Sequence, residues 1–480
     1  MEDVILPELG EGIKEATVAC WHHQVGDTVT KDDDLVELVT DKASFNVQAS
    51  CSGVLKEILY QEGEQAPIGK ILAKLQPVVS TPRATMQLTK VDKKRVLLMY
   101  ITRVSGHRQA TLAIQKSLKQ LDPTIETPTI NGFGYTYPIL EKIVNSAYMS
   151  VIKTTPGVWD YMYDNPKLVK NTKMIKNFLH KTSHEKIGRL FAKYKPDCVV
   201  CTQAFPCGMV ADYKREHNLK TTLIGVLTDF HPHSFWINEG VDYYIVPCLE
   251  AKERFIKKGI HPDSVKVYGI PMRPQFALQL DKRPIAEKLG LNPNLPTILV
   301  MGGGQGLGPI KDTVKSLIRV NMDFQIIVLA GINKKILSTL ERFSKKSLKK
   351  ILIFEFANNV DELMELANLI ITKPGGMTTA ESLAKGLPMV IVNPIPGQEM
   401  RNTDFLLKNG IAIRIDDTND IGEEVELLLK SPERLTAMSQ QAYAHAKPYA
   451  ALNVAQLILD NSHPSLSLGP AHANFVKTYV

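Results

Sequence analysis

The feature that most constrains the fold is a set of three polar loops, each of which follows an apolar run and precedes a helical pattern. Their sequences are MGGGQGLGP (301–309), TKPGGMTTAES (372–382) and PGQEMRN (396–402). Apolar runs that alternate with amphipathic patterns predict a parallel sheet covered by helices. Because ligands bind beyond the carboxyl ends of such strands, we expect the three loops to meet at one edge of a sheet and form a binding site.

The glycines of the first two loops are suited to phosphate groups. Glycine permits tight turns and close approach of phosphate oxygens, and the start of the following helix adds N–H donors and a partial positive charge. The first loop matches neither the Walker pattern nor GxGxxG, so alone it is equally typical of a structural turn. Gly376, Met377 and Thr378 open the second helix and are expected to supply further N–H donors.

Polar side chains in the last two loops are suited to hydroxyl groups. Glu381 lies one turn into the second helix, where its carboxylate can accept hydrogen bonds from a ribose; its alternative role is charge balance at the helix start. Gln398, Glu399 and Asn402 suit sugar hydroxyls, and the alternative is a solvated loop. Because all three loops follow strand ends, we favour one shared ligand.

Composition divides the chain into an acidic part and a basic body. Residues 1–77 contain 6 lysines, no arginine and 14 acidic residues, so they carry a charge of −8 and the remainder carries +15 of the total of +7. A length of 480 residues predicts about three domains. We expect a cytoplasmic protein without disulfides, because the sequence contains no membrane-spanning apolar run, no signal-peptide pattern and only six cysteines.

The acidic part has an all-β pattern of short apolar runs separated by turns. Lys42 falls between two of these runs, DLVELVT and SFNVQA, where a hairpin tip would expose it to a modifying enzyme. The motifs are PELGEG (7–12), VGD (25–27), TDKA (40–43), SG (52–53) and EG (62–63). With these motifs the acidic part resembles the lipoyl domain of the dihydrolipoamide acyltransferases.

That resemblance implies a flattened β-barrel with lipoate in amide linkage to Lys42. Biotin carriers flank the lysine with methionines, so Asp41 and Ala43 favour lipoate. A lipoate-attaching enzyme or a lipoate-using complex would then be a partner. The alternative is that Lys42 is unmodified and the domain is a docking or solubility element.

Changes in composition predict the domain boundaries. The lipoyl-type domain spans residues 1–77, and residues 78–93 form a linker that lacks apolar periodicity. Two halves rich in alternating strand and helix patterns follow at 94–275 and 276–455, with a tail at 456–480. The fold class is therefore α/β, with two parallel-sheet domains behind an all-β domain.

Three further motifs lie in the first half of the body: SGHR (105–108), TDFHPH (228–233) and VYGIPMRPQF (267–276). Together with the three loops they make residues 94–455 similar to the monogalactosyldiacylglycerol synthases and processive diacylglycerol glucosyltransferases. These are relatives of the transferase that adds N-acetylglucosamine to undecaprenyl-linked muramyl peptide. The resemblance implies two facing Rossmann-like domains of the GT-B type, inverting hexose transfer, and a UDP-sugar donor bound by the second domain.

The resemblance also implies roles for residues of the second domain. The donor-binding residues are Gly303, Gly304 and Gln305 for the diphosphate, Phe356 for the uracil, Glu381 for the ribose, and Gln398, Glu399 and Asn402 for the sugar or diphosphate side. The first-domain loop departs from the family's triple-glycine version, because it reads SGHRQA.

Inverting transfer requires a base that removes the proton of the acceptor hydroxyl. His107 lies at the first strand-to-helix turn, and an ordinary imidazole pKa near 6.5 suits this task; alternatively it positions the acceptor. Asp229 is a rival base or an orienting partner. We expect no metal, because the body has no Asp-X-Asp motif and His231 and His233 have no third ligand nearby in sequence. Glycine-loop N–H groups would then stabilise the leaving UDP.

A basic, aromatic segment in the first half suggests membrane contact. Residues 142–189 contain nine basic and three acidic residues, with lysines at 167, 170, 173 and 176 and several aromatic residues among them. Such a stripe suits an anionic membrane surface, and the alternative is a solvated helix face. We therefore expect peripheral association with the inner face of the membrane and a diacylglycerol-type acceptor, and no nucleic-acid partner.

Two other functions stay open at this point. One is transfer to a polyprenyl-linked sugar, and the other is a lipoyl-domain scaffold with an inactive transferase body. The intact donor loops and His107 disfavour the scaffold. The sequence does not distinguish UDP-glucose from UDP-galactose.

Overall fold

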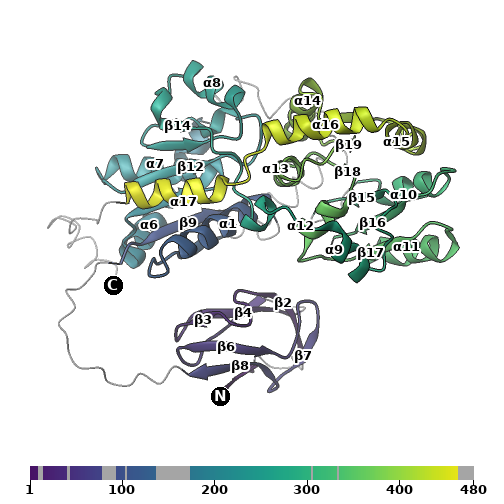
Figure 1. The fold of residues 1–480 in the computed structure, drawn as a ribbon. Coiled ribbons are helices and arrows are strands. Elements are labelled where there is room, and N and C mark those ends of the chain that lie inside the picture. The colour runs from purple at the N-terminus through teal and green to yellow at the C-terminus, as the bar shows by residue number, and fades with distance from the viewer. Residues whose placement is uncertain are drawn as a thin grey trace. The chain divides into compact units, whose positions relative to one another are not determined.

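The computed structural model describes residues 1–8, 15–40, 44–77, 93–102, 105–136, 173–303, 306, 308–331 and 334–462 (Figure 1). Only the backbone is described for residues 44, 173–183, 234, 334 and 335. The chain divides into two compact units, Met1–Val91 and Asp92–Val480. Within the described residues, no helix combines the length and apolar character needed to cross a membrane.

The first unit consists of two four-stranded antiparallel sheets, as expected for a lipoyl-type domain (Figure 1). Their orders are β1-β8-β6-β3 and β5-β4-β2-β7. The strands are β1 (Glu2–Ile5), β2 (Glu15–Trp21), β3 (Thr28–Val29), β4 (Asp34–Val39), β5 (Ser44–Gln48), β6 (Gly53–Ile58), β7 (Gln65–Pro67) and β8 (Ile71–Pro77). Alternating side chains such as Val18, Leu38, Leu55 and Leu75 are buried and form one core.

The second unit begins with a parallel sheet of order β10-β9-β11-β12-β13-β14. Its strands are β9 (Val96–Tyr100), β10 (Thr129–Asn131), β11 (Cys198–Cys201), β12 (Thr222–Val226), β13 (Tyr243–Ile245) and β14 (Val265–Lys266). Its helices are α1 (Gly106–Leu121), α2 (Gly132–Thr136), α6 (Lys173–Tyr194), α7 (Ala204–Glu216) and α8 (Leu249–Lys257), with 3-10 turns η1 (Ser234–Trp236), η2 (Pro262–Ser264) and η3 (Pro274–Ala277). The strands are short continuous apolar runs, such as CVVC, because helices cover both faces of a parallel sheet.

A second parallel sheet has the order β17-β16-β15-β18-β19-β20. Its strands are β15 (Thr297–Met301), β16 (Gln325–Leu329), β17 (Ile351–Phe354), β18 (Leu369–Thr372), β19 (Met389–Val392) and β20 (Ala412–Ile415). The accompanying helices are α9 (Lys282–Lys288), α10 (Ile310–Ile318), α11 (Lys334–Lys346), α12 (Val360–Leu366), α13 (Gly376–Ala384), α14 (Gln398–Lys408), α15 (Ile421–Leu429), α16 (Pro432–His445) and α17 (Ala450–Asn461). This confirms the expected pair of Rossmann-like domains.

Strand order places the glycine loops at the point where ligands bind to such sheets. The chain leaves β15 to one side and later returns to β18 on the other, so β15 and β18 are neighbours with diverging connections. The crevice outside this switch point is the usual ligand position of a doubly wound sheet. The loops after β15 and β18 are the first and second of the three polar loops.

The last described helix, α17, packs on the first domain. The sequence instead predicts that the second domain ends at residue 455. Helix α17 lies against α1 (Figure 1), and its residues Val454 and Ile458 share a core with Ile114 and Leu118 of α1. The hydroxyl of Thr222, in β12, also donates to the carbonyl oxygen of residue 461 at 2.6 Å. By its packing, α17 therefore belongs to the first sheet, and a boundary at 455 falls inside this helix.

Candidate active site

The two halves of the second unit touch where the predicted catalytic and donor loops lie. A Cβ atom built on Gly376, at the start of α13, would be 1.7 Å from the carbonyl oxygen of Thr228 and 3.1 Å from Oδ1 of Asp229. A Cβ atom on Gly106, at the start of α1, would be 2.9 Å from Cγ of Met377. Both glycines are therefore required by close approach, and residues from both domains meet in one place.

The backbone start of α1 positions His107. Ser105 is the N-cap residue, and its hydroxyl oxygen accepts a hydrogen bond from the backbone N–H of Arg108 at 3.3 Å. The imidazole Nδ1 lies 2.8 Å from the carbonyl oxygen of Thr202 and 2.9 Å from Oγ1 of Thr228. Since a carbonyl oxygen only accepts, Nδ1 carries the hydrogen and Nε2 carries the lone pair.

His107 is neutral near pH 7 in this environment. Burial lowers its pKa to about 4, and the hydrogen bond to the Thr202 carbonyl acts in the opposite direction. A neutral ring with a defined tautomer can accept a proton through Nε2. Its low pKa makes it a weaker base than an ordinary imidazole.

The carboxylate of Asp229 accepts hydrogen bonds from two residues of the second domain, Gln398 and Asn402. Burial raises the pKa of its carboxyl group to about 6, while hydrogen bonds from Gln398 and Asn402 oppose this rise. The pKa of Asp229 is therefore nearer to neutrality than that of His107. Its hydrogen bonds come from Gln398 and Asn402, and its expected role as a partner that orients the imidazole stays a prediction.

Asn402, which was expected to bind the donor, forms hydrogen bonds with residues of both domains in this structure. Its Oδ1 accepts from the backbone N–H of Phe230 at 3.0 Å, and its Nδ2 donates to the carbonyl of Pro374 at 2.9 Å and to Asp229 at 3.4 Å. Asn402 is also fully buried, and the ring of Phe230 stacks on that of Phe405 at 4.6 Å. These bonds occupy the amide with protein partners, because the tertiary fold brings two sheet edges together.

Glu399 is likewise occupied by protein groups. Its Oε1 lies 3.0 Å from Nζ of Lys373, and its Oε2 accepts from the backbone N–H of Ile395 at 2.8 Å. Lys373 also lies beside the glycine loop, since a Cβ atom on Gly308 would be 3.6 Å from its Cδ. Lys373, which the sequence did not single out, therefore joins the second polar loop to Glu399 of the third and lies beside the first.

The first glycine loop makes a tight turn after β15. Gly303 has a φ of +70°, in the left-handed region that favours glycine, and its carbonyl accepts from the N–H of Gly306 at 2.9 Å. Gly304 and Gln305, expected at the diphosphate, lie outside the described residues. The tight turn at Gly303 therefore agrees with the predicted glycine loop, and the positions of Gly304 and Gln305 stay predictions.

Glu381, the expected ribose residue, lies near a cation that the sequence did not single out. Glu381 is half-buried on α13; burial raises its pKa to about 7, and the nearby Arg273 guanidinium lowers it. Arg273 donates to the carbonyl of Asn358 at 2.7 Å, two residues after Phe356. Phe356 is 58 % exposed, which leaves its ring available for stacking on a base.

The remaining donor residues lie on the two helix starts. Gly376, Met377 and Thr378 form the first turn of α13, and Gln398 is the first residue of α14. Gly397 precedes Gln398 with a φ of +87°. Lys42 and residues 142–172 of the basic, aromatic segment lie outside the described residues, and the last two lysines of the stripe, Lys173 and Lys176, are described only by the backbone of α6.

Three family models match the chain. They are monogalactosyldiacylglycerol (MGDG) synthase at residues 107–272, the glycosyltransferase family 28 C-terminal domain at residues 297–454, and biotin-requiring enzyme at residues 2–75. The first match begins after β9 and covers the rest of the first sheet, the second covers the whole second sheet, and the third covers most of the antiparallel unit.

Curated relatives match along the body. A processive diacylglycerol beta-glucosyltransferase of Bacillus licheniformis is 30% identical over 348 residues, which cover 72% of this chain and 90% of the relative. A protein with the same description from Bacillus subtilis is 29% identical over 369 residues, covering 77% of this chain and 94% of the relative.

Solved structures share the fold of the body. MurG of Acinetobacter baumannii aligns with a TM-score of 0.53 at 16% identity, covering 77% of this chain and 100% of that protein. UDP-GlcNAc 2-epimerase of Neisseria meningitidis aligns with a TM-score of 0.50 at 14% identity, covering 76% and 100%. At these identities the likeness concerns the fold alone.

Proposed function

The chain belongs to the family of the processive diacylglycerol β-glucosyltransferases, and from this premise we propose that it transfers a hexose from a UDP-sugar to diacylglycerol or a glycosyl-diacylglycerol. The observation that carries the proposal is the contact between the start of α13 and the loop after β12. This contact places the second polar loop, which we propose binds the donor, beside Thr228 and Asp229 and, through Met377, beside the start of α1 that carries His107.

In the proposed reaction, His107 acts as the base. Its Nε2 takes the proton of the acceptor hydroxyl while the hydroxyl oxygen attacks the anomeric carbon of the sugar. The bond between that carbon and the UDP oxygen breaks with inversion, and the electron pair leaves with UDP. The Nδ1–H bond to the Thr202 carbonyl supports this role because it leaves Nε2 unprotonated.

The leaving diphosphate is proposed to sit against the N–H groups of the glycine loop and of α13. Gly303, Gly304 and Gln305 would supply one set of donors, and Gly376, Met377 and Thr378 the other. Gln398 would contact the sugar side. Glu381 would accept from the ribose, and Phe356 would stack near the uracil. We propose that Asn402 and Glu399 position these loops, because their polar atoms are bonded to protein.

Two further proposals concern the surroundings of the enzyme. Lipoate on Lys42 is supported by the TDKA motif and by the match of residues 2–75 to a family of biotin and lipoyl domains. Peripheral association with an anionic membrane is supported by the basic, aromatic segment at residues 142–189 and by the lipid acceptor.

Product analysis tests the proposed reaction. Purified full-length protein is mixed with diacylglycerol vesicles and either UDP-glucose or UDP-galactose, and the lipids are analysed by mass spectrometry. We expect a hexosyl-diacylglycerol from one donor, and its loss in His107→Ala. The exposed His261 provides the control variant His261→Ala, which should keep full activity. Absence of product with both donors would overturn the proposal.

A further inference from the structure

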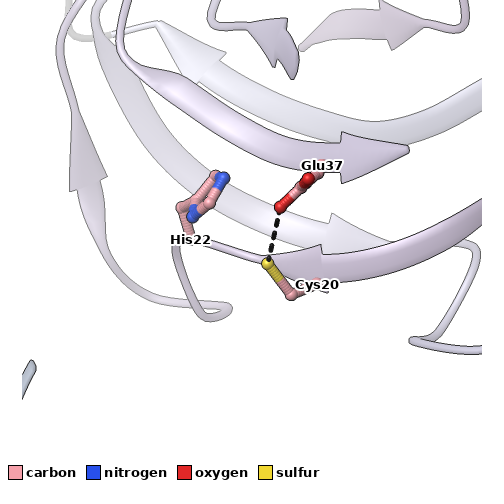
Figure 2. Close-up of side chains that lie close together, drawn as sticks. All are labelled: Cys20, His22 and Glu37. Atoms are coloured by element: carbon pink, nitrogen blue, oxygen red, sulfur yellow. Dashed lines mark hydrogen bonds between the residues drawn. The ribbon is translucent and has the colours of Figure 1, made fainter. Parts of the chain in front are cut away.

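A cysteine, a histidine and a glutamate come together on the antiparallel unit, which does not contain the proposed transferase site. The ligand-type atoms of Cys20, His22 and Glu37 all lie within 4.8 Å of one another (Figure 2). The thiol of Cys20 contacts Oε2 of Glu37 at 4.0 Å. Figure 2 shows the cysteine and glutamate side chains pointing toward each other across two strands, with the histidine beside them.

Strand geometry explains why these three side chains share a face. In β2 the residues Ala16 and Val18 are buried, and an irregularity in the pairing with β4 follows Val18. This bulge places Cys20 directly opposite Glu37 in the register, whereas an unbroken ladder would have placed residue 19 there. Side chains two apart in a strand point to the same face, so His22 lies on the side of Cys20.

The neighbouring tryptophan holds this orientation. The indole N–H of Trp21 donates to the carbonyl of Tyr60 at 2.9 Å, and its ring packs against the core of the unit. The backbone N–H of His22 donates to the carbonyl of Leu35 at 2.8 Å, which keeps this residue on the ladder with β4. The hydrogen bonds of Trp21 and His22 therefore fix the direction in which Cys20 and His22 point.

We propose that Cys20, His22 and Glu37 bind a divalent cation of the zinc class. A thiolate, an imidazole and a carboxylate are the ligand types that Zn²⁺ accepts, and three protein ligands leave a fourth position for water or another ligand. Zinc bonds near 2.3 Å to sulfur and 2.0 Å to nitrogen set ligand atoms about 3.5 Å apart, so side-chain adjustments close the remaining gap. On binding, the thiol loses its proton to solvent and a sulfur–metal bond forms.

Exposure gives the ion a path to the site. Cys20 and Glu37 are half-buried and His22 is exposed. Of the other cysteines, Cys198, Cys201, Cys207 and Cys248 are buried in the second unit, and Cys51 is the remaining half-buried thiol. Cys51 and the adjacent His23 are therefore matched controls from the same unit.

Cobalt binding tests the site on the full-length, tag-free protein. The Lys42→Arg variant is used throughout, so that a dithiol on this lysine cannot supply thiolates. Co²⁺ should bind at one equivalent with a sulfur-to-cobalt charge-transfer band and tetrahedral visible bands, and Zn²⁺ should displace it. Cys20→Ser should remove the charge-transfer band, while His22→Gln and Glu37→Gln should weaken binding at least tenfold. Cys51→Ser and His23→Gln should change neither band nor affinity.

Two results would overturn the proposal. The first is the absence of a charge-transfer band in the parent protein at saturating Co²⁺. The second is a band that survives Cys20→Ser, or that Cys51→Ser removes. Circular dichroism of each variant separates loss of ligand from loss of fold. Because the readout is metal binding, it is independent of the proposed transferase reaction.

Discussion

The Nδ1 atom of His107 lies 2.8 Å from the carbonyl oxygen of Thr202, at the end of the neighbouring strand β11. The switch point between β9 and β11 thereby fixes the tautomer of the proposed base. Thr228, from the end of β12, adds its hydroxyl at 2.9 Å from the same nitrogen. Two strand ends of the first sheet therefore orient one ring.

Removal of the Thr228 hydroxyl should lower turnover while donor binding is kept. We expect Thr228→Val to reduce kcat about 3–10-fold, because the ring loses one of two orienting contacts worth about 1 kcal/mol. Thr228→Ser should restore most of the activity, since it keeps the hydroxyl. Steady-state kinetics with varied UDP-sugar make the measurement, and a change confined to KM would contradict the orienting role.

The dependence of kcat/KM on pH should distinguish the two candidate bases. A base must be unprotonated, so activity falls as pH falls through its pKa. With His107 as the base, the acid limb should lie near pH 4, because burial lowers this pKa to about 4. A limb near pH 6 that disappears in Asp229→Asn would instead assign the base to Asp229, whose pKa is raised to about 6.

Glu381→Gln should stabilise the protein at pH 8 and weaken donor binding. Burial raises the pKa of Glu381 to about 7 from an ordinary value of 4.5, so its ionised form costs stability above that ordinary pKa, and the full cost applies above pH 7. We expect a gain of about 1–3 kcal/mol in unfolding free energy at pH 8 and little gain at pH 4. Denaturant titration at both pH values measures it.

The exposed Glu253 on α8 provides the control, since Glu253→Gln should leave stability unchanged at either pH. A Glu381→Gln variant that is equally or less stable at pH 8 would contradict the proposed cost of desolvating the ionised Glu381 carboxylate. An unchanged KM for the UDP-sugar would contradict the ribose role.

Gly376→Ala should prevent the contact between the two domains. The added Cβ would lie 1.7 Å from the Thr228 carbonyl oxygen, which is part of the backbone, so the loop after β12 must shift. We expect a loss of at least about 2 kcal/mol in stability, or a change to an open arrangement, together with a large loss of activity. Calorimetry and product assays measure both.

Gly375→Ala is the matched control one residue earlier. Its Cβ would have no neighbour within 4 Å, and its φ of −64° is open to alanine. Equal losses in the two variants would show that the close approach at Gly376 is not the cause.

Local patterns were sufficient for the fold class of both parts of the chain. Apolar runs such as TILVM and LIIT become β15 and β18 because a parallel strand is buried on both faces and needs no polar alternation. The glycine loops could also be placed at strand ends, because each loop directly follows such an apolar run in the sequence. The motifs around Lys42 and the alternation in β2 similarly predicted an all-β unit.

Contacts between distant segments could not be predicted in this way. The amide of Asn402 joins residues 230 and 374, α17 returns to the first sheet, and a bulge places Cys20 opposite Glu37. Each of these depends on register or on packing between segments far apart in the chain. Sequence periodicity predicts which side of a helix or strand is buried. It does not predict which distant segment packs against that side, because this depends on the tertiary structure.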